Sequence, residues 1–532
     1  MGGPAVTAPH PVGRTTHSVP PVRHGAASEA TGPSAHRREL ADVARGGVFN
    51  LVGALTYGLG GFLVVAVVAR QLPVADAGAV LVAIAVFTVL ARCAEMGAST
   101  GVVRAVSRAR ALGRLDEIRR VLVVATVPVG LVGSVLGIAL WTQAERLGDL
   151  LGGADQADRV ATALRPLAAA LPAVAVGSVL VAASRGFSTM VPQLVVDRMA
   201  RPLAQLVAVW LATGLTASVA VTAGAWVVPA ALVGVPMAVV LAARLPATAA
   251  GSWVRIGREF WRFTAPRAGA QVLQVTILWF DTLLLSAVAG PATAGVYAVA
   301  TRFVLVGTFA AEALQQVVGP RVAAQLALDD RAGASRLLDA AAGWQVLLVW
   351  PSFVLLGVFA PGVLAVFGAS YADAAAVLGV LALGLLAAAP VGPSDSVLLM
   401  AGRSRANLGV TALAAAVNVV GNLVLVPTAG MVGAASAWAT SLAVGAIVPA
   451  VLVRRMGIAP TGRPAVTAAA VGLVASGGGA TAGLVVAGRS ITGLVVAVVL
   501  GVPTLLAVAR RQSGLELTSV VQGFRRSPMG VS

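Results

Sequence analysis

The stretch VLVVATVPVGLVGSVLGIALW, from Val121 to Trp141, contains no charged residue and is long enough to cross the hydrocarbon core of a bilayer as a helix. Apolar runs of about twenty residues recur along most of the chain. Only 11% of the 532 residues are charged, and the mean hydropathy is +0.90. The sequence therefore predicts an all-α polytopic membrane protein rather than a set of globular domains.

About 14 transmembrane helices are expected from these runs. They are predicted at residues 47–69, 78–99, 121–141, 162–183, 194–214, 219–243, 265–289, 294–318, 340–360, 373–400, 407–427, 431–453, 465–487 and 491–511. The predicted organisation is a disordered cytoplasmic tail at 1–45, an N-lobe (TM1–6) at 46–243, a C-lobe (TM7–12) at 244–455, an added helix pair (TM13–14) at 456–511 and a cytoplasmic C-terminal tail at 512–532.

Arginine is concentrated in every second loop between the predicted spans. The loop near residue 110 alone holds Arg104, Arg108, Arg110, Arg114, Arg119 and Arg120. The alternate loops near Gly290 and Gly430 carry no charge, and the largest of them, 141–161, is acidic. The positive-inside rule places both termini in the cytoplasm, with the protein in the inner or plasma membrane. This topology explains the formal net charge of +17 without a nucleic-acid partner.

Several residue types are missing from the predicted spans, and this narrows the chemistry. The chain has no lysine, so it has no P-loop lysine for ATP hydrolysis. All four histidines lie within the first 36 residues, and Cys93 is the single cysteine. We therefore expect no cofactor, no metal site and no disulfide, and a transporter rather than an enzyme.

The chain also contains an internal repeat. LPVADAGAVLVA, from Leu72 to Ala83, resembles AGPATAGVYAVA, from Ala289 to Ala300, and aligns Gly78 with Gly295. Both copies follow the first span of a predicted lobe, so the repeat is parallel. Transporters built from such repeats bind their substrate near the bilayer midplane between the halves.

Polar residues inside the spans are the candidate lining of a substrate cavity, because an ionisable group near the bilayer centre costs about 2.5–3.5 kcal/mol. Arg267, Gln271, Gln274 and Asp281 form one helical stripe. The other candidates are Asn50, Arg92, Glu95, Arg302, Asn418 and Asn422. Structural alternatives stay open: a local Arg92–Glu95 ion pair, a buried Asp281–Arg302 pair, and hydrogen bonds of the two asparagines between helices.

Three segments carry a resemblance to a known family. They are RGGVFNLVGALTYGLGGFLVVAVVARQLPVADAG (Arg45 to Gly78), FDTLLLSAVAGPATAGVYAVATRF (Phe280 to Phe303) and VNVVGNLVLVPTAGMVGAASAWAT (Val417 to Thr440). Together they resemble the Wzx-type polysaccharide and O-antigen flippases of the multidrug/oligosaccharidyl-lipid/polysaccharide (MOP) exporter superfamily.

The resemblance implies two pseudo-symmetric six-helix lobes around a central cavity that opens alternately to the two sides of the membrane. It implies a polyprenyl-diphosphate-linked glycan as substrate, membrane lipids and glycan-synthesis enzymes as partners, and Arg302 and Arg92 as diphosphate contacts. The two added C-terminal spans are similar to those of lipid II flippases, where such a pair forms a groove for the lipid tail.

Two other functions are weighed against a flippase. A drug/cation antiporter of the MATE type, in the same superfamily, would favour acidic residues in its cavity, whereas the spans here are richer in arginine. A membrane-embedded glycan polymerase or ligase would need a large outer loop with catalytic residues, and the predicted loop 141–161 is short and lacks histidine.

Overall fold

The computed structural model describes Gly2, Gly53 and residues 56–187, 191–244, 252–304, 318–319, 321–458 and 460–511. The chain divides into two units, Met1–Val52 and Gly53–Ser532, and every described helix belongs to the second unit. The described residues contain no strand, which confirms the predicted all-α fold class. Apart from Gly2, the predicted tail at 1–45 lies outside the described residues.

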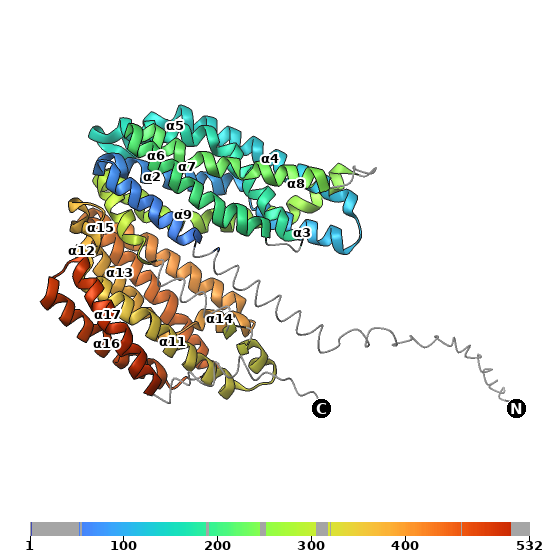
Figure 1. Ribbon diagram of the computed structural model, residues 1–532. Coiled ribbons are helices and arrows are strands. Elements are labelled where there is room, and N and C mark those ends of the chain that lie inside the picture. Colours follow the sequence, from blue (N-terminus) through green and yellow to red (C-terminus); the bar gives the residue numbers. More distant parts are fainter. Residues whose placement is uncertain are drawn as a thin grey trace. The chain divides into compact units, whose positions relative to one another are not determined.

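Helices make up both halves of the second unit (Figure 1). In the first half they are Thr56–Gln71, α2 (Val74–Glu95), α3 (Ala98–Ala111), α4 (Leu115–Thr142), α5 (Ala144–Gly186), the π-helix η1 (Gln193–Ala200), α6 (Arg201–Thr216), α7 (Val219–Leu232) and α8 (Gly234–Arg244). In the second half they are α9 (Trp253–Thr301), α11 (Arg331–Val358), α12 (Ala360–Ala365), η2 (Ala369–Ala374), α13 (Ala375–Ala388), η3 (Ala389–Val391), α14 (Ser394–Met400), α15 (Ser404–Arg455), α16 (Arg463–Ala487) and α17 (Ile491–Arg511).

Three of these helices, α5, α9 and α15, each contain a glycine at which the chain turns back. Gly153, Gly290 and Gly430 have φ angles of 61°, 82° and 53°, which residues other than glycine rarely adopt. In α15 a Cβ on Gly421 would lie 2.9 Å from the Ala437 side chain, and the Ser441 hydroxyl donates to the Ala414 carbonyl. These contacts join residues on the two sides of Gly430, so α15 is a hairpin of two antiparallel helices, as the uncharged loop near Gly430 predicted.

Every predicted span overlaps a described helix. In the described part of the chain, nine helices are long and apolar enough to cross a membrane, and the 51-residue helix Arg405–Arg455 among them includes the Gly430 turn. Two shorter apolar helices, Thr56–Gln71 and Ile491–Ala507, coincide with further predicted spans. The number of fourteen spans stays a prediction, as do the lobe boundaries.

Two local predictions were wrong. The expected loop at 141–161 is largely helical, since α5 already begins at Ala144. This helix and its return after Gly153 pack closely because Gly148 faces the Ala157 carbonyl, where a Cβ would overlap. The expected single span at 373–400 is interrupted after η3 by Gly392, with a φ of 61°, and by Pro393, which cannot continue a helix.

Helix α2 packs against α5 and α9. The span that it begins, Val74–Ala111, is the most buried of the candidate spans in the described residues, with 67% of its apolar window inside the protein. Where α2 begins, Gly78 lies against the backbone of Pro291 and Ala292. A Cβ on Gly295 would lie 2.5 Å from the Cα of Gly78, so the two glycines aligned by the internal repeat touch each other. Contact between equivalent residues is what a two-fold relation between the repeats produces.

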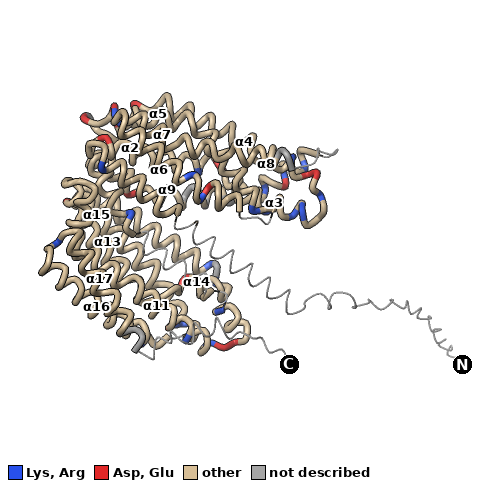
Figure 2. Tube along the Cα trace, in the orientation of Figure 1, with Lys and Arg blue, Asp and Glu red and all other residues tan. Residues whose placement is uncertain are grey.

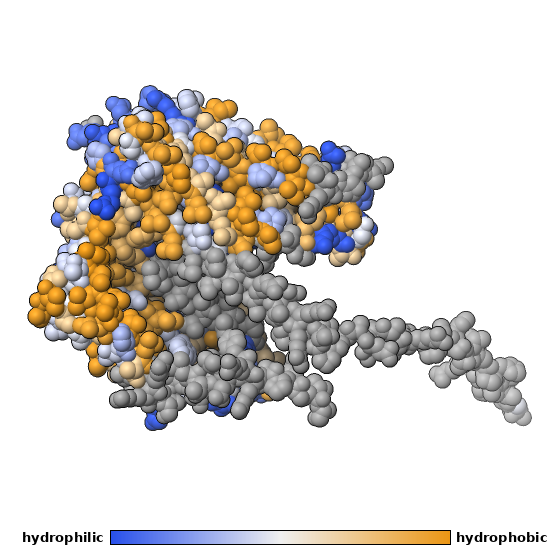
Figure 3. Space-filling model, viewed as in Figure 1, coloured by the Kyte–Doolittle hydropathy of each residue, from blue (hydrophilic) through white to orange (hydrophobic). Residues whose placement is uncertain are grey.

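Helix α4 shows the opposite pattern along one face. Val127, Leu131, Val135 and Ile138 are between 52% and 66% exposed and follow helical spacing. The face drawn in Figure 3 is largely hydrophobic, and Figure 2 shows charged residues gathered near helix ends. An apolar exterior with charges at the ends is the surface expected of helices in a bilayer. The protein is a multi-pass membrane protein.

The C-terminal helices form a packed pair rather than a detached one. α16 packs against both α17 and α11. Its start is fixed by Asp339 of α11, whose carboxylate accepts hydrogen bonds from the backbone amides of Thr461 and Gly462, each at 2.8 Å. A lipid-tail groove at this pair stays a prediction.

Candidate functional site

Asp281 is a buried carboxylate in the first arm of the α9 hairpin. The hydroxyl of Tyr297, in the second arm, donates to Asp281 Oδ2 at 2.7 Å. The backbone amide of Thr282 donates to Oδ1 at 2.7 Å, and the Thr282 hydroxyl lies 3.3 Å from the same oxygen. No ion pair within 4.0 Å joins Asp281 to Arg302, although both side chains are described. Asp281 therefore links the two arms of α9 through Tyr297.

Arg302 follows the last residue of α9 and is half-buried. Its guanidinium carbon lies 5.4 Å from the centre of the Trp279 ring, a cation–π contact. Its Nε is buried and has no hydrogen-bond acceptor among the described residues. The residue lies twelve positions beyond the Gly290 turn, or about 18 Å along a helix, which corresponds to the middle of a bilayer about 30 Å thick.

Aromatic rings adjoin this position. Phe303 makes edge-to-face contacts with Phe62 at 5.3 Å and with Phe367 at 5.9 Å between ring centres, and Phe62 also contacts Phe367. Phe62 belongs to the helix Thr56–Gln71, and Phe367 follows α12. Arg302 thus lies beside a point where three segments distant in sequence meet.

Arg92 and Glu95 form a local ion pair on α2, which confirms the structural alternative for these two residues. Arg92 Nη1 lies 3.2 Å from Glu95 Oε1, and the Ser99 hydroxyl donates to Oε2 at 2.6 Å. The Glu95 side chain is 3% exposed and that of Arg92 53% exposed. Arg92 therefore keeps an accessible guanidinium while neutralising a buried carboxylate.

The remaining members of the predicted α9 stripe do not meet Asp281. The Gln271 amide donates to the Thr100 hydroxyl at 3.3 Å, toward α3, and Gln274 is exposed with no partner among described residues. The side chain of Arg267, like the whole of Asn50, lies outside the described residues. The stripe is one face of a helix, but its described members have different neighbours.

Asn418 and Asn422 are both buried on α15. The Asn422 side-chain amide donates to the Asn418 backbone carbonyl at 2.9 Å and approaches the Asn418 side-chain oxygen at 3.3 Å. Asn422 Oδ1 is buried without a partner in the described part of the chain. The two asparagines share one face as predicted, and they bond to each other within one helix rather than to another helix.

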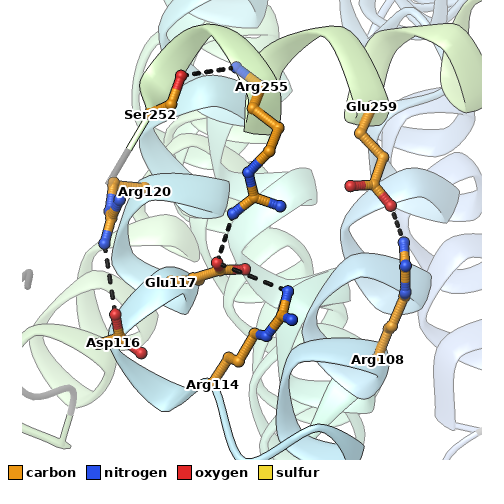
Figure 4. A network of polar contacts seen from close by, with 8 residues as sticks. All are labelled: Arg108, Arg114, Asp116, Glu117, Arg120, Ser252, Arg255 and Glu259. Atoms are coloured by element: carbon orange, nitrogen blue, oxygen red, sulfur yellow. Dashed lines mark hydrogen bonds and ion pairs between the residues drawn. The ribbon is translucent and has the colours of Figure 1, made fainter. Parts of the chain in front are cut away.

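A second polar group lies where α3, the start of α4 and the start of α9 come together (Figure 4). Arg108 of α3 forms an ion pair with Glu259 of α9. Glu117 of α4 accepts from Arg255 of α9 at 2.6 Å and lies 3.9 Å from Arg114. Sequence reasoning interpreted these arginines as topology signals and missed Glu117 and Glu259. The signal that was available is that Asp116, Glu117 and Glu259 interrupt otherwise basic segments.

No group of three or more histidine, cysteine or acidic residues that could hold a metal ion is present among the described residues. The described candidate residues offer hydrogen bonds and positive charge from arginine, the hydrogen-bonded carboxylates of Asp281 and Glu95, and aromatic faces. Such groups can bind and release an ion or an anionic molecule.

Comparison with known proteins agrees with this architecture. The family model described as "Polysaccharide biosynthesis protein" matches residues 43–324, slightly more than half of the chain. No match was found among curated proteins. The structure is similar to the lipid II flippase MurJ in its inward closed conformation, with a TM-score of 0.68 at 12% identity, covering 89% of this chain and 99% of that one.

It is also similar to an inward-facing multidrug resistance MATE family transporter of the MOP superfamily, with a TM-score of 0.61 at 16% identity, covering 76% of this chain and 97% of that one. At identities this low, the structural similarity establishes a shared fold. The chain belongs to the polysaccharide biosynthesis protein family and has the fold of MOP-superfamily transporters.

Proposed function

We propose that the protein is a flippase that moves a polyprenyl-diphosphate-linked oligosaccharide from the cytoplasmic to the outer leaflet by alternating access. Its family supports a role in polysaccharide synthesis, and its fold supports transport. The observation that carries the proposal is Arg302: a half-buried arginine near mid-depth, with no carboxylate within 4.0 Å among the described residues and a buried Nε that lacks an acceptor there.

An arginine in this setting favours an anionic substrate. Burying a charge without a partner is costly, and a guanidinium recovers that cost when it meets phosphate oxygens. A diphosphate offers two adjacent anionic groups that fit the planar fork of arginine. Before a phosphate binds, the Trp279 ring beside the guanidinium restricts the orientation of Arg302.

The energy source consistent with the sequence is the membrane potential or an ion gradient, since the chain has no P-loop lysine. Each elementary charge that crosses a potential of 100 mV is coupled to about 2.3 kcal/mol. The proposed orientation, with both termini and the arginine-rich helix ends in the cytoplasm, would let this potential act on an anionic headgroup moving outward.

The likeness to a MATE transporter makes a drug/cation antiporter the second candidate. A cation site needs an available carboxylate. The two oxygens of Asp281 already accept hydrogen bonds from Tyr297 and Thr282, and Glu95 is paired with Arg92. These contacts favour the anionic substrate.

The test is mass spectrometry of polyprenyl-linked sugars in cells with and without this protein, combined with an assay of which leaflet holds them. A flippase predicts that depletion causes a complete lipid-linked oligosaccharide to accumulate on the cytoplasmic leaflet. Unchanged pools in a strain lacking related flippases, together with lost efflux of cationic dyes, would instead support the antiporter.

A further inference from the structure

The polar group in Figure 4 borders a cavity between α3, the start of α4 and the start of α9. Its lining combines basic and apolar side chains. The basic residues are Arg104, Arg108, Arg114 and Arg255, with Arg262 in the adjoining hollow. The apolar lining includes Ala105, Ala109, Leu112, Ile256 and Phe260.

The charges in this cavity do not balance. Arg108, Arg114 and Arg255 share two carboxylates, Glu117 and Glu259. Arg104 and Arg262 are exposed and have no carboxylate partner among the described residues.

The guanidinium of Arg104 instead lies 3.9 Å from the centre of the Phe263 ring. That ring holds the guanidinium beside the cavity. Five arginines against two glutamates leave a surplus of three positive charges.

The length of the first arm of α9 indicates how deep this cavity would lie in a membrane. Glu259 is 31 residues before the Gly290 turn, or about 46 Å. This helical stretch exceeds the hydrocarbon core of about 30 Å and matches the roughly 40–45 Å of core plus headgroups, so Glu259 reaches the headgroup region.

We propose that this cavity is a binding site for the phosphate of an anionic lipid. Arg104 and Arg262 would contact the phosphate oxygens, while the apolar lining covers the adjoining part of the lipid chain. Glu259 and Trp279, whose ring contacts Arg302, are 20 residues apart on one continuous helical arm, about 30 Å, so this site is distinct from the one at Arg302. The phosphate belongs either to a membrane phospholipid or to a polyprenyl diphosphate.

The experiment titrates the full-length protein with phosphatidylglycerol or with undecaprenyl diphosphate, and native mass spectrometry reports the bound lipid. The site variant is Arg104→Gln/Arg262→Gln. The matched control is Arg119→Gln/Arg405→Gln, which removes the same charge from two exposed arginines that do not line the cavity. We expect the site variant to raise the Kd about tenfold or more and the control less than about twofold.

A second variant tests the sign of the effect. Glu259→Gln removes a negative charge and releases Arg108, so it should tighten binding by about threefold. The lipid that binds more tightly identifies the source of the phosphate.

Equal losses in the site and control variants, or no saturable binding of either lipid, would overturn the proposal. Binding is measured without transport, so this result is independent of whether the flippase proposal holds.

Discussion

The chain places arginine in two contrasting settings. In the group of Figure 4, Arg108 and Arg255 are 55% and 50% exposed and each meets a glutamate. Arg302 is half-buried beside Trp279, with its Nε unsatisfied among described residues. Solvated ion pairs contribute about 0–1 kcal/mol each, whereas an ionised group at mid-membrane costs about 2.5–3.5 kcal/mol. The proposed binding of an anionic substrate would offset the cost of Arg302, for which the described residues supply no ion pair within 4.0 Å.

The largest effect is expected at Arg302. Arg302→Ala should lower transport of the lipid-linked glycan about 100-fold while the protein remains inserted, because it removes the proposed charge-assisted contact with the diphosphate. Arg302→Lys should keep part of the activity, since it keeps the charge and loses the planar fork. The measurement is leaflet accessibility of the lipid-linked glycan. Wild-type transport by a stable Arg302→Ala protein would remove this residue from the site.

The next effect concerns the contact between the two repeats. In Gly78→Ala the new Cβ would overlap the backbone carbonyl of Pro291, so α2 and α9 must separate. We expect a loss of about 1–3 kcal/mol in the free energy of unfolding. Gly61→Ala is the control, because a Cβ there meets nothing within 4 Å and alanine favours a helix by up to about 1 kcal/mol. Equal thermal midpoints for both variants would contradict the close contact.

The sequence predicts the fold class and the turns at Gly290 and Gly430, because apolar length and missing charge are local properties of the chain. The shared face of Asn418 and Asn422 is equally local. Tyr297 was missed as the partner of Asp281, since their meeting depends on how the two arms of α9 cross. The ion pair of Arg108 and Glu259 joins residues 151 positions apart, and no periodicity encodes such a contact.

A smaller effect distinguishes two buried tyrosines. Tyr297→Phe removes the hydroxyl that donates to Asp281 and should cost about 1–3 kcal/mol in the free energy of unfolding, because it leaves a buried carboxylate short of a donor. Tyr371 is equally buried, and its hydroxyl has no partner among the described residues. Tyr371→Phe should therefore be neutral or slightly stabilising. Thermal unfolding in detergent compares the two, and matching losses would show that burial alone sets the cost.

The smallest effect on stability is expected in the exposed group. Glu259→Gln breaks the pair with Arg108, whose side chains are 47% and 55% exposed, so the free energy of unfolding should fall by less than about 1 kcal/mol. Its effect should also shrink as salt is added, because exposed charges are screened over about 10 Å at 0.1 M. A loss of several kcal/mol that persists in high salt would mean that the pair is needed to hold α9 against α3. The arginines would then be structural ties, and the contrast with Arg302 would disappear.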